Sequence, residues 1–231
     1  MSRHIVESRP PALLFDLDGT LIDSVYQHVL AWQEALTGVG IELSVWRLHR
    51  RIGMSGGLFV TALLRETGGT LSAEEIAELH RAHTEAFARR RDMVRPLPGA
   101  RELLAELTER RVLWAIATSG LAAAAQPALE MLGLPGDTPL ITRDEVRHAK
   151  PDPDLFLAAA ERIGVDVSAA IVVGDSIWDL LAARRAGALG VGLLSGGYGS
   201  DELERAGAYR VYADPADLLI HLDEVGVRRP D

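Results

Sequence analysis

Four short polar segments follow apolar runs in this sequence, and together their side chains supply carboxylates, hydroxyls and one ammonium group. The segments are Asp16-Leu-Asp18-Gly-Thr20, Thr118-Ser119-Gly120, Ala149-Lys150-Pro151 and Gly174-Asp175-Ser-Ile-Trp-Asp179. Each segment alone could be an ordinary turn, a helix N-cap or a capped helix start. If all four lie at one edge of a sheet, however, turn and cap roles do not explain why these groups gather there. A reactive site would explain it.

The acidic residues of these segments predict a bound cation. Carboxylates that pack together raise each other's pKa unless a positive charge neutralises them. The chain contains no cysteine, and no histidine lies within the four segments. Oxygen ligands without sulfur or imidazole favour a hard ion, and Mg²⁺ fits best.

Lys150 is the only lysine among the 24 lysine and arginine residues of the chain. Its ammonium is a compact charge with three rotating donors, which the planar guanidinium of arginine cannot reproduce. A single lysine could have survived by chance. It lies in Ala149-Lys-Pro-Asp-Pro153, a loop that enters a helix, and the acidic and hydroxyl residues at similar junctions elsewhere in the chain favour a function.

The elements expected to position these residues alternate between strands and helices. Short apolar runs predict strands at Ala12–Phe15, Val112–Ala117, Leu140–Thr142, Ala170–Val173 and Leu189–Leu193. Amphipathic patterns predict helices at Gly99–Glu109, Leu121–Leu132, Pro153–Ile163, Ile177–Ala186 and Asp201–Ala206. This alternation implies right-handed crossovers and a doubly wound, Rossmann-like parallel α/β sheet. Such sheets bind ligands at the carboxyl ends of their strands, where the four polar segments are expected.

Residues 24–95 interrupt this alternation and predict an inserted all-α cap domain. Helical patterns occur at Val25–Leu36, Leu58–Thr67 and Ser72–Arg91, and Ser72-Ala-Glu-Glu75 has the spacing of a capping box. Pro96-Leu-Pro98-Gly99 then marks the return of the chain. The expected α/β core domain therefore consists of residues 11–23 and 96–231.

In their order, the four segments resemble the four motifs of the haloacid dehalogenase superfamily. The resemblance covers nearly the whole chain, because the helical insert falls where that family places its helical, C1-type cap. It points to the branch that contains phosphoglycolate phosphatases and beta-phosphoglucomutases. It implies a Mg²⁺-dependent phosphatase that hydrolyses a small phosphorylated metabolite, of the phosphoglycolate or sugar-phosphate type, through an aspartyl-phosphate.

The resemblance also implies a role for each polar residue. Asp16 is the expected nucleophile, and Asp18 is the expected general acid and base. Mg²⁺ would be held by Asp16, the backbone carbonyl of Asp18, and Asp175. The substrate's phosphate would be bound by Thr118, Ser119, Gly120 and Lys150. Asp179 would orient Lys150 or a metal-bound water, and Asp179 and Thr20 would support the site from behind.

Individual residues separate the possible reactions. Asp18 favours phosphoryl transfer over dehalogenation, because a leaving alkoxide needs a proton and a halide does not. The absence of lysine from residues 24–95 excludes the Schiff-base chemistry of phosphonoacetaldehyde hydrolases. Gly174 and the loop Gly53–Gly57 depart from the mutase pattern, which stays an alternative. A receiver-like signalling module and a non-catalytic binding protein are further alternatives, although receivers lack both the lid and the second acid.

The cap is expected to choose the substrate. Candidate residues for contact with it are His28, Arg50, Arg51, Ser55 and Gly56. The arginines could reach an anionic group, while the serine and glycine could bind hydroxyls or a second anion. His28 and the two arginines also have a structural alternative, because a helical histidine is often a packing residue and arginines often cap helix C-termini.

Composition narrows the class of partner. The chain has 231 residues, a net charge of −9 and a hydrophobic content of 48%. These values fit a core domain with an insert, and they argue against general binding to nucleic acid or membrane surfaces. No run of 18 apolar residues occurs, and Met1 to Pro11 show no secretory signal. We therefore expect a cytoplasmic enzyme, monomeric or homodimeric, that acts on a small molecule.

Overall fold

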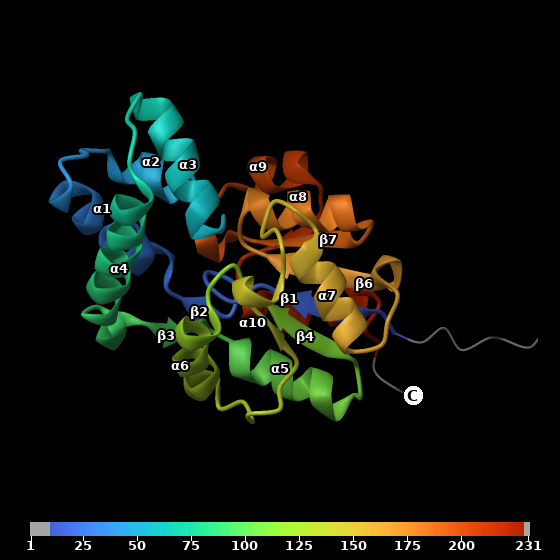
Figure 1. The fold of residues 1–231 in the computed structure, drawn as a ribbon. Coiled ribbons are helices and arrows are strands. Elements are labelled where there is room, and N and C mark those ends of the chain that lie inside the picture. Colours follow the sequence, from blue (N-terminus) through green and yellow to red (C-terminus); the bar gives the residue numbers. More distant parts are fainter. Residues whose placement is uncertain (1–9, 229–231) are drawn as a thin grey trace, which may run out of the picture.

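Figure 1 shows the computed structural model of the chain, in which residues 10–228 are described. The main sheet has six strands in the order β5-β4-β1-β6-β7-β8, and every neighbouring pair is parallel. The strands are β1 (Ala12–Phe15), β4 (Trp114–Ala117), β5 (Leu140–Ile141), β6 (Ala170–Gly174), β7 (Leu189–Leu193) and β8 (Ala208–Tyr212). This order confirms the predicted doubly wound sheet.

The side chains of β1 alternate between two hydrophobic cores, because successive residues of a strand point to opposite faces of a sheet. Leu13 and Phe15 pack in the core that faces α5 (Ala100–Glu109), α6 (Ala122–Leu132) and α10 (Pro215–Ile220). Leu14 packs in the core that faces α7 (Asp154–Arg162) and α8 (Ile177–Ala186). Helix α9 (Ser200–Ala206) packs against α8 and β8. Helices therefore cover both faces.

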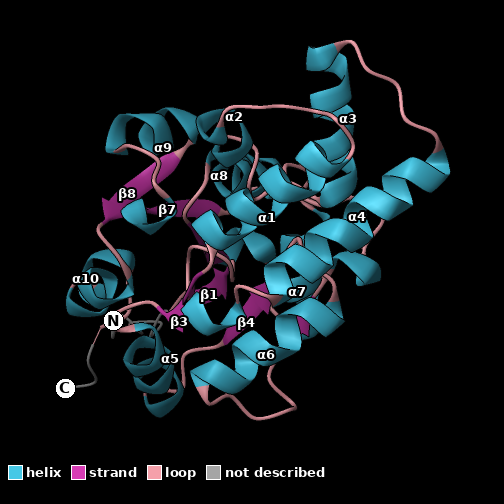
Figure 2. Ribbon diagram, turned by 90° about the vertical axis from the view of Figure 1, so that its left-hand side faces the viewer, coloured by secondary structure: helices cyan, strands magenta, loops and turns pink. Residues whose placement is uncertain are grey.

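The sequence patterns missed β8 and α10 and began β4 two residues too early. Figure 2 shows β8 beside β7, at the edge of the sheet. Tyr209 and Arg210 are exposed on β8, so this strand has no continuous apolar run. Only Tyr212 of this strand is buried, so its sequence does not differ clearly from that of a loop.

Four α-helices lie between Asp23 and Arg95 and form a helical cap, in the segment where the sequence predicts an inserted helical domain. They are α1 (Val25–Gly38), α2 (Val45–His49), α3 (Gly56–Thr67) and α4 (Ala73–Ala88). Trp32, Phe59, Leu63 and Leu79 form part of their own hydrophobic core. The predicted capping box of α4 is present, since the Ser72 hydroxyl accepts from the backbone N–H of Glu75 at 3.2 Å.

Two short strands join the cap to the sheet domain. β2 (Ile22–Asp23) and β3 (Arg95–Pro96) pair in antiparallel fashion, so the chain leaves the sheet domain and returns to it at adjacent points. Short 3₁₀ helices complete the described chain at Arg91–Met93, Arg143–Glu145, Val167–Ala169, Leu194–Gly196 and Leu222–Val225.

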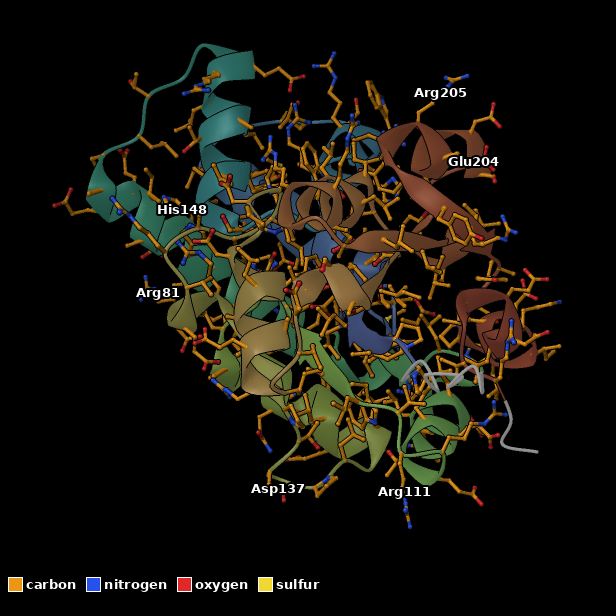
Figure 3. The ribbon with its side chains drawn as sticks, turned by 90° about the vertical axis from the view of Figure 1, so that its right-hand side faces the viewer. Arg81, Arg111, Asp137, His148, Glu204 and Arg205 are labelled. Atoms are coloured by element: carbon orange, nitrogen blue, oxygen red, sulfur yellow. The ribbon has the colours of Figure 1, made fainter. Side chains whose placement is uncertain are left out.

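Charged side chains lie mainly on the outside, as Arg111, Asp137, Glu204 and Arg205 do in Figure 3. The longest helix of residues 10–228, α4, has 16 residues, fewer than the roughly 20 that a bilayer-spanning helix needs. Residues 1–9 and 229–231 lie outside the described part of the chain. The expected absence of a secretory signal concerns Met1 to Pro11, most of which falls outside this part.

Candidate active site

The four polar segments meet because three of them follow adjacent strands. Strand β1 lies between β4 and β6, so residues after these strands come together at the carboxyl edge of the sheet. Asp16 follows β1, Thr118 follows β4 and Asp175 follows β6. Lys150 reaches the same edge from the loop before α7.

Lys150 is fully buried and lies between two carboxylates. Its ammonium donates a hydrogen bond to Asp16 Oδ1 and lies 2.8 Å from Asp179 Oδ1. The Phe156 ring packs against it, with its centroid 5.0 Å from Nζ. Burial alone would lower the pKa of Lys150, but the two carboxylates raise it above its ordinary value. The lysine is therefore a fixed positive charge at neutral pH.

Asp16, Asp175 and Asp179 form a cluster with too much negative charge for one lysine. One carboxylate oxygen of each lies within 4.8 Å of the others, and all three residues are buried. Burial raises the pKa of Asp16 to about 7, against the lowering effect of Lys150. Burial and the neighbouring carboxylates raise the pKa of Asp175 well above its usual range. A divalent cation would neutralise this excess, so the cluster could bind a metal.

Neighbouring residues hold the cluster in place. The Thr20 hydroxyl donates to Asp175 Oδ1 at 2.8 Å. The Ser176 hydroxyl donates to Asp179 Oδ2 at 2.5 Å, which leaves the other oxygen of Asp179 to face Lys150. Asp179 thus lies where the sequence hypothesis expected a residue that orients the lysine.

Asp18 is held from the cap side of the site. The Ser24 hydroxyl donates to its Oδ1 at 2.6 Å, and His28 Nε2 lies 3.4 Å from the same oxygen. Burial would raise the pKa of Asp18, but the hydrogen bonds from His28 and Ser24 outweigh it and lower the pKa below its usual value. His28 Nδ1 in turn shares a hydrogen bond of 3.2 Å with His83 Nε2.

A column of stacked rings keeps His28 in this position. The centroid distances are 4.3 Å between Phe59 and Trp32, 4.1 Å between Trp32 and His83, and 3.9 Å between His28 and Phe87. The column crosses three cap helices, so the orientation of His28 depends on the packing of the whole cap.

Thr118, Ser119 and Gly120 lie at the start of the loop before α6. The Thr118 hydroxyl accepts from the backbone N–H of Gly120 at 3.0 Å. The Ser119 hydroxyl donates to the carbonyl oxygen of Gly53 at 3.0 Å, which ties this loop to the cap.

A cavity of about 500 Å³ lies between the sheet edge and the cap. The predicted site residues that line it are Asp16, Asp18, Thr118, Ser119, Gly120, His28, Arg51 and Gly56. Lys150, Asp175 and Asp179 lie behind this wall, in contact with Asp16 or with one another.

Two of the cap residues predicted from the sequence are not among those that line the cavity. The Arg50 guanidinium pairs with Glu202 and lies 4.4 Å from the ring centroid of Tyr198, so it joins the cap to the sheet domain. The Ser55 hydroxyl caps α3 by accepting from the backbone N–H of Leu58 at 3.4 Å. Neither residue therefore has the predicted contact with the cavity.

The sequence analysis missed the wall that α4 contributes. His80, His83 and Thr84 of this helix line the cavity, and Phe87 follows on the same face. The positions i, i+3, i+4 and i+7 share one side of a helix, so the spacing was a usable signal.

The loop Ser195–Gly199 also lies beside the site. The Ser195 hydroxyl donates to the carbonyl oxygen of Gly19 at 2.6 Å. A Cβ atom on Gly196 would overlap the carboxylate of Asp175. His49 Nε2 donates to the carbonyl oxygen of Gly196 at 2.7 Å, so the loop touches both the acidic cluster and the cap.

Comparisons with known proteins identify the family of this chain. Residues 10–187 match the haloacid dehalogenase-like hydrolase family. The chain is 32% identical to hexitol phosphatase A of Escherichia coli, over 78% of this chain and 81% of that protein. It is 31% identical to a phosphoglycolate phosphatase of Caulobacter vibrioides, over 90% of this chain and 86% of that protein.

Solved structures of other proteins share the fold of this chain. A hydrolase from Pseudomonas syringae superposes with a TM-score of 0.92 and 53% identity, covering 94% of this chain and 99% of that one. A beta-phosphoglucomutase from Clostridium difficile shares the fold at 22% identity, with a TM-score of 0.81 over 94% of this chain and 96% of that one. By sequence match and by fold, this chain belongs to the haloacid dehalogenase-like hydrolase family.

Proposed function

We propose that this enzyme is a Mg²⁺-dependent phosphatase that hydrolyses a small phosphorylated metabolite through an aspartyl-phosphate on Asp16. Family membership, with relatives named as phosphatases, indicates a phosphoric monoester hydrolase. The observation that carries the proposal is the buried Asp16–Lys150–Asp179 arrangement at the edge of a 500 Å³ cavity.

Asp16 is the proposed nucleophile. One of its carboxylate oxygens forms a bond to phosphorus as the bond between phosphorus and the substrate alcohol breaks. Lys150 holds the carboxylate by the other oxygen, Oδ1, and supplies a positive charge next to the phosphate. Thr118 and the Ser119–Gly120 turn also line the cavity and are the proposed ligands of the phosphate oxygens. The backbone N–H of Gly120 donates to the Thr118 hydroxyl, so it would exchange this partner for the phosphate.

Asp18 is the proposed proton carrier. It gives a proton to the leaving alkoxide and then takes one from the water that attacks the aspartyl-phosphate. Because the pKa of Asp18 is lowered, its carboxylate must receive a proton before the first step. His28, at 3.4 Å from Oδ1, is the group placed to share it.

The acidic cluster fits a hard cation, which would be held by Asp16, Asp175 and the backbone carbonyl of Asp18. When bound, Mg²⁺ would screen the charge of the phosphate from the anionic nucleophile. Asp179 is already engaged by Lys150 and Ser176, so we propose that it positions the lysine.

Hydrolysis of p-nitrophenyl phosphate tests the proposal. We expect phosphate release that requires Mg²⁺, stops with chelator and is lost in Asp16→Asn. Metal-independent turnover by Asp16→Asn would refute it. Conversion of glucose 1-phosphate to glucose 6-phosphate, with no free phosphate, would identify a mutase instead. A long-lived aspartyl-phosphate without phosphate release would favour the signalling alternative. The cytoplasmic location and the monomeric or homodimeric state stay predictions from the sequence.

A further inference from the structure

We propose that the cap cavity selects phosphate esters of neutral polyols or sugars over esters whose alcohol part carries a carboxylate. We further propose that His80 hydrogen-bonds to a hydroxyl group of the substrate. This inference rests on the proposed phosphatase function and names the substrate class of the same site.

The size of the cavity is the first argument. Its volume of about 500 Å³ lies within the range of pockets that enclose drug-sized ligands. A two-carbon acid such as glycolate would leave most of this space unfilled. A sugar or polyol of about six carbons would occupy more of it and would reach the cap helices.

The charges of the wall are the second argument. Beyond the residues assigned to the phosphate site, two arginines line the cavity, and both already have acceptors. Arg51 pairs with Glu66 and donates to the carbonyl oxygen of Arg47 at 2.6 Å. Arg143 donates to the carbonyl oxygen of Val146 at 2.7 Å and is followed by Asp144, a carboxylate on the same wall.

The imidazoles of α4 do not supply a positive charge that could bind a substrate carboxylate. Burial lowers the pKa of His83 to about 2, and burial also lowers the pKa of His80. Both rings are therefore neutral at pH 7. A neutral imidazole carries one donor and one acceptor, which matches a hydroxyl group better than a carboxylate.

His80 is the ring that can bind the substrate. His83 is engaged by His28, but no hydrogen bond or ion pair of the His80 side chain occurs among residues 10–228. Its ring packs edge-on against Trp32 at a centroid distance of 5.5 Å. A Cβ atom on Gly56 would lie 2.6 Å from His80 Cε1, so this glycine leaves the space that the imidazole occupies.

The test compares two substrates that differ at one carbon. Sorbitol 6-phosphate and 6-phosphogluconate have the same chain and hydroxyls, except that the first carbon is a hydroxymethyl group in one and a carboxylate in the other. We expect kcat/KM of the purified enzyme with Mg²⁺ to be at least about tenfold higher for sorbitol 6-phosphate, because a buried unpaired charge is costly. Equal or reversed values would overturn the proposal.

Two variants test the wall's charge and the role of His80. Glu66→Gln removes the partner of Arg51, so it should shift the ratio of the two kcat/KM values toward 6-phosphogluconate by about threefold or more. His80→Ala should raise KM for sorbitol 6-phosphate more than KM for p-nitrophenyl phosphate, which has no hydroxyl, by up to about tenfold. An unchanged ratio in either variant would refute the corresponding part.

Further measurements keep the result interpretable. Gly56→Ala should displace the His80 ring and change KM in the same direction, so it replaces His80→Ala if that variant does not fold. His221→Ala alters a histidine of the opposite domain, which does not line the cavity, and should leave both ratios unchanged. If no substrate releases phosphate, the proposed function fails. If phosphate is released but acidic substrates are preferred, only this inference fails.

Discussion

The two walls of the cavity differ in how they hold their polar groups. On the sheet side, Lys150 and three buried carboxylates form a network of fixed charges. On the cap side, Phe59, Trp32 and His83 belong to a column of stacked aromatic rings. Fixed charges stabilise one kind of transition state, whereas neutral rings select by shape and hydrogen bonding. Changes on the sheet side should therefore affect every substrate, and changes on the cap side should affect the choice among them.

The largest expected effect concerns the nucleophile. Asp16→Asn should lower kcat by about 10⁴-fold or more for every substrate, because covalent catalysis is lost. Phosphate release from p-nitrophenyl phosphate measures this. Asp137→Asn, at an exposed position, is the matched control and should behave like the wild type. A loss restricted to one substrate would contradict the division between the walls.

Lys150→Arg should be the next most severe change. The ammonium has no exposed surface, so the larger guanidinium must displace its neighbours, at a cost of about 1–3 kcal/mol in the free energy of unfolding. We expect kcat to fall by roughly 100-fold, since the point charge beside Asp16 moves. Thermal unfolding and steady-state kinetics measure the two effects.

The control for this variant is the reverse exchange, Arg205→Lys, at an exposed position of α9. It should change neither the stability nor kcat. Normal kinetics in Lys150→Arg would mean that the single lysine of the chain has no special role.

The cap should lose stability in acid because of His83. Burial lowers its folded-state pKa to about 2, so between pH 2 and 6.5 the unfolded chain binds a proton that the folded chain does not. Stability should therefore fall as the pH drops below about 6.5, by up to about 1.4 kcal/mol per pH unit from this group. His83→Phe should remove this contribution while keeping a ring against Trp32.

Urea unfolding of both proteins at pH 7, 6 and 5 measures the difference. We expect the free energy of unfolding of His83→Phe to improve relative to the wild type as the pH falls. Parallel curves would show that the buried imidazole does not titrate on unfolding.

The smallest expected effect concerns the contact between the cap and the sheet domain. Arg50 and Glu202 are both partly exposed, so their ion pair should contribute no more than about 1 kcal/mol. Glu202→Gln should change KM by less than about fivefold, and added salt should reduce the difference. Titration of KM with NaCl in both proteins tests this. A large fall in kcat would contradict this prediction and would mean that the contact contributes to catalysis.

The residues that follow strands were predictable from the sequence. Short apolar runs identified β1, β4 and β6, and parallel strands bring their carboxyl ends to one edge. Asp16, Thr118 and Asp175 could therefore be placed together without knowledge of any side-chain contact.

The wall of the cap was less predictable, because the amphipathic pattern of a helix does not specify which cap residues face the sheet domain. Arg50 and Arg51 are adjacent in sequence, yet one contacts Glu202 outside the cavity and the other lines it. The rotation and packing of the cap helices decide this, and these depend on contacts between segments far apart in the chain. The spacing of His80, His83 and Thr84 places them on one side of a helix, but the same packing decides that this side lines the cavity.

The antiparallel pair of β2 and β3 has a consequence for how such enzymes can be altered. Asp23 lies opposite Arg95, so the ends of the intervening segment are already neighbours. Because the sheet domain holds these two ends together, exchanging the segment between them adds little loop-closure entropy to folding. The segment between β2 and β3 could therefore be replaced by another helical domain, which would give the same reaction a different substrate range.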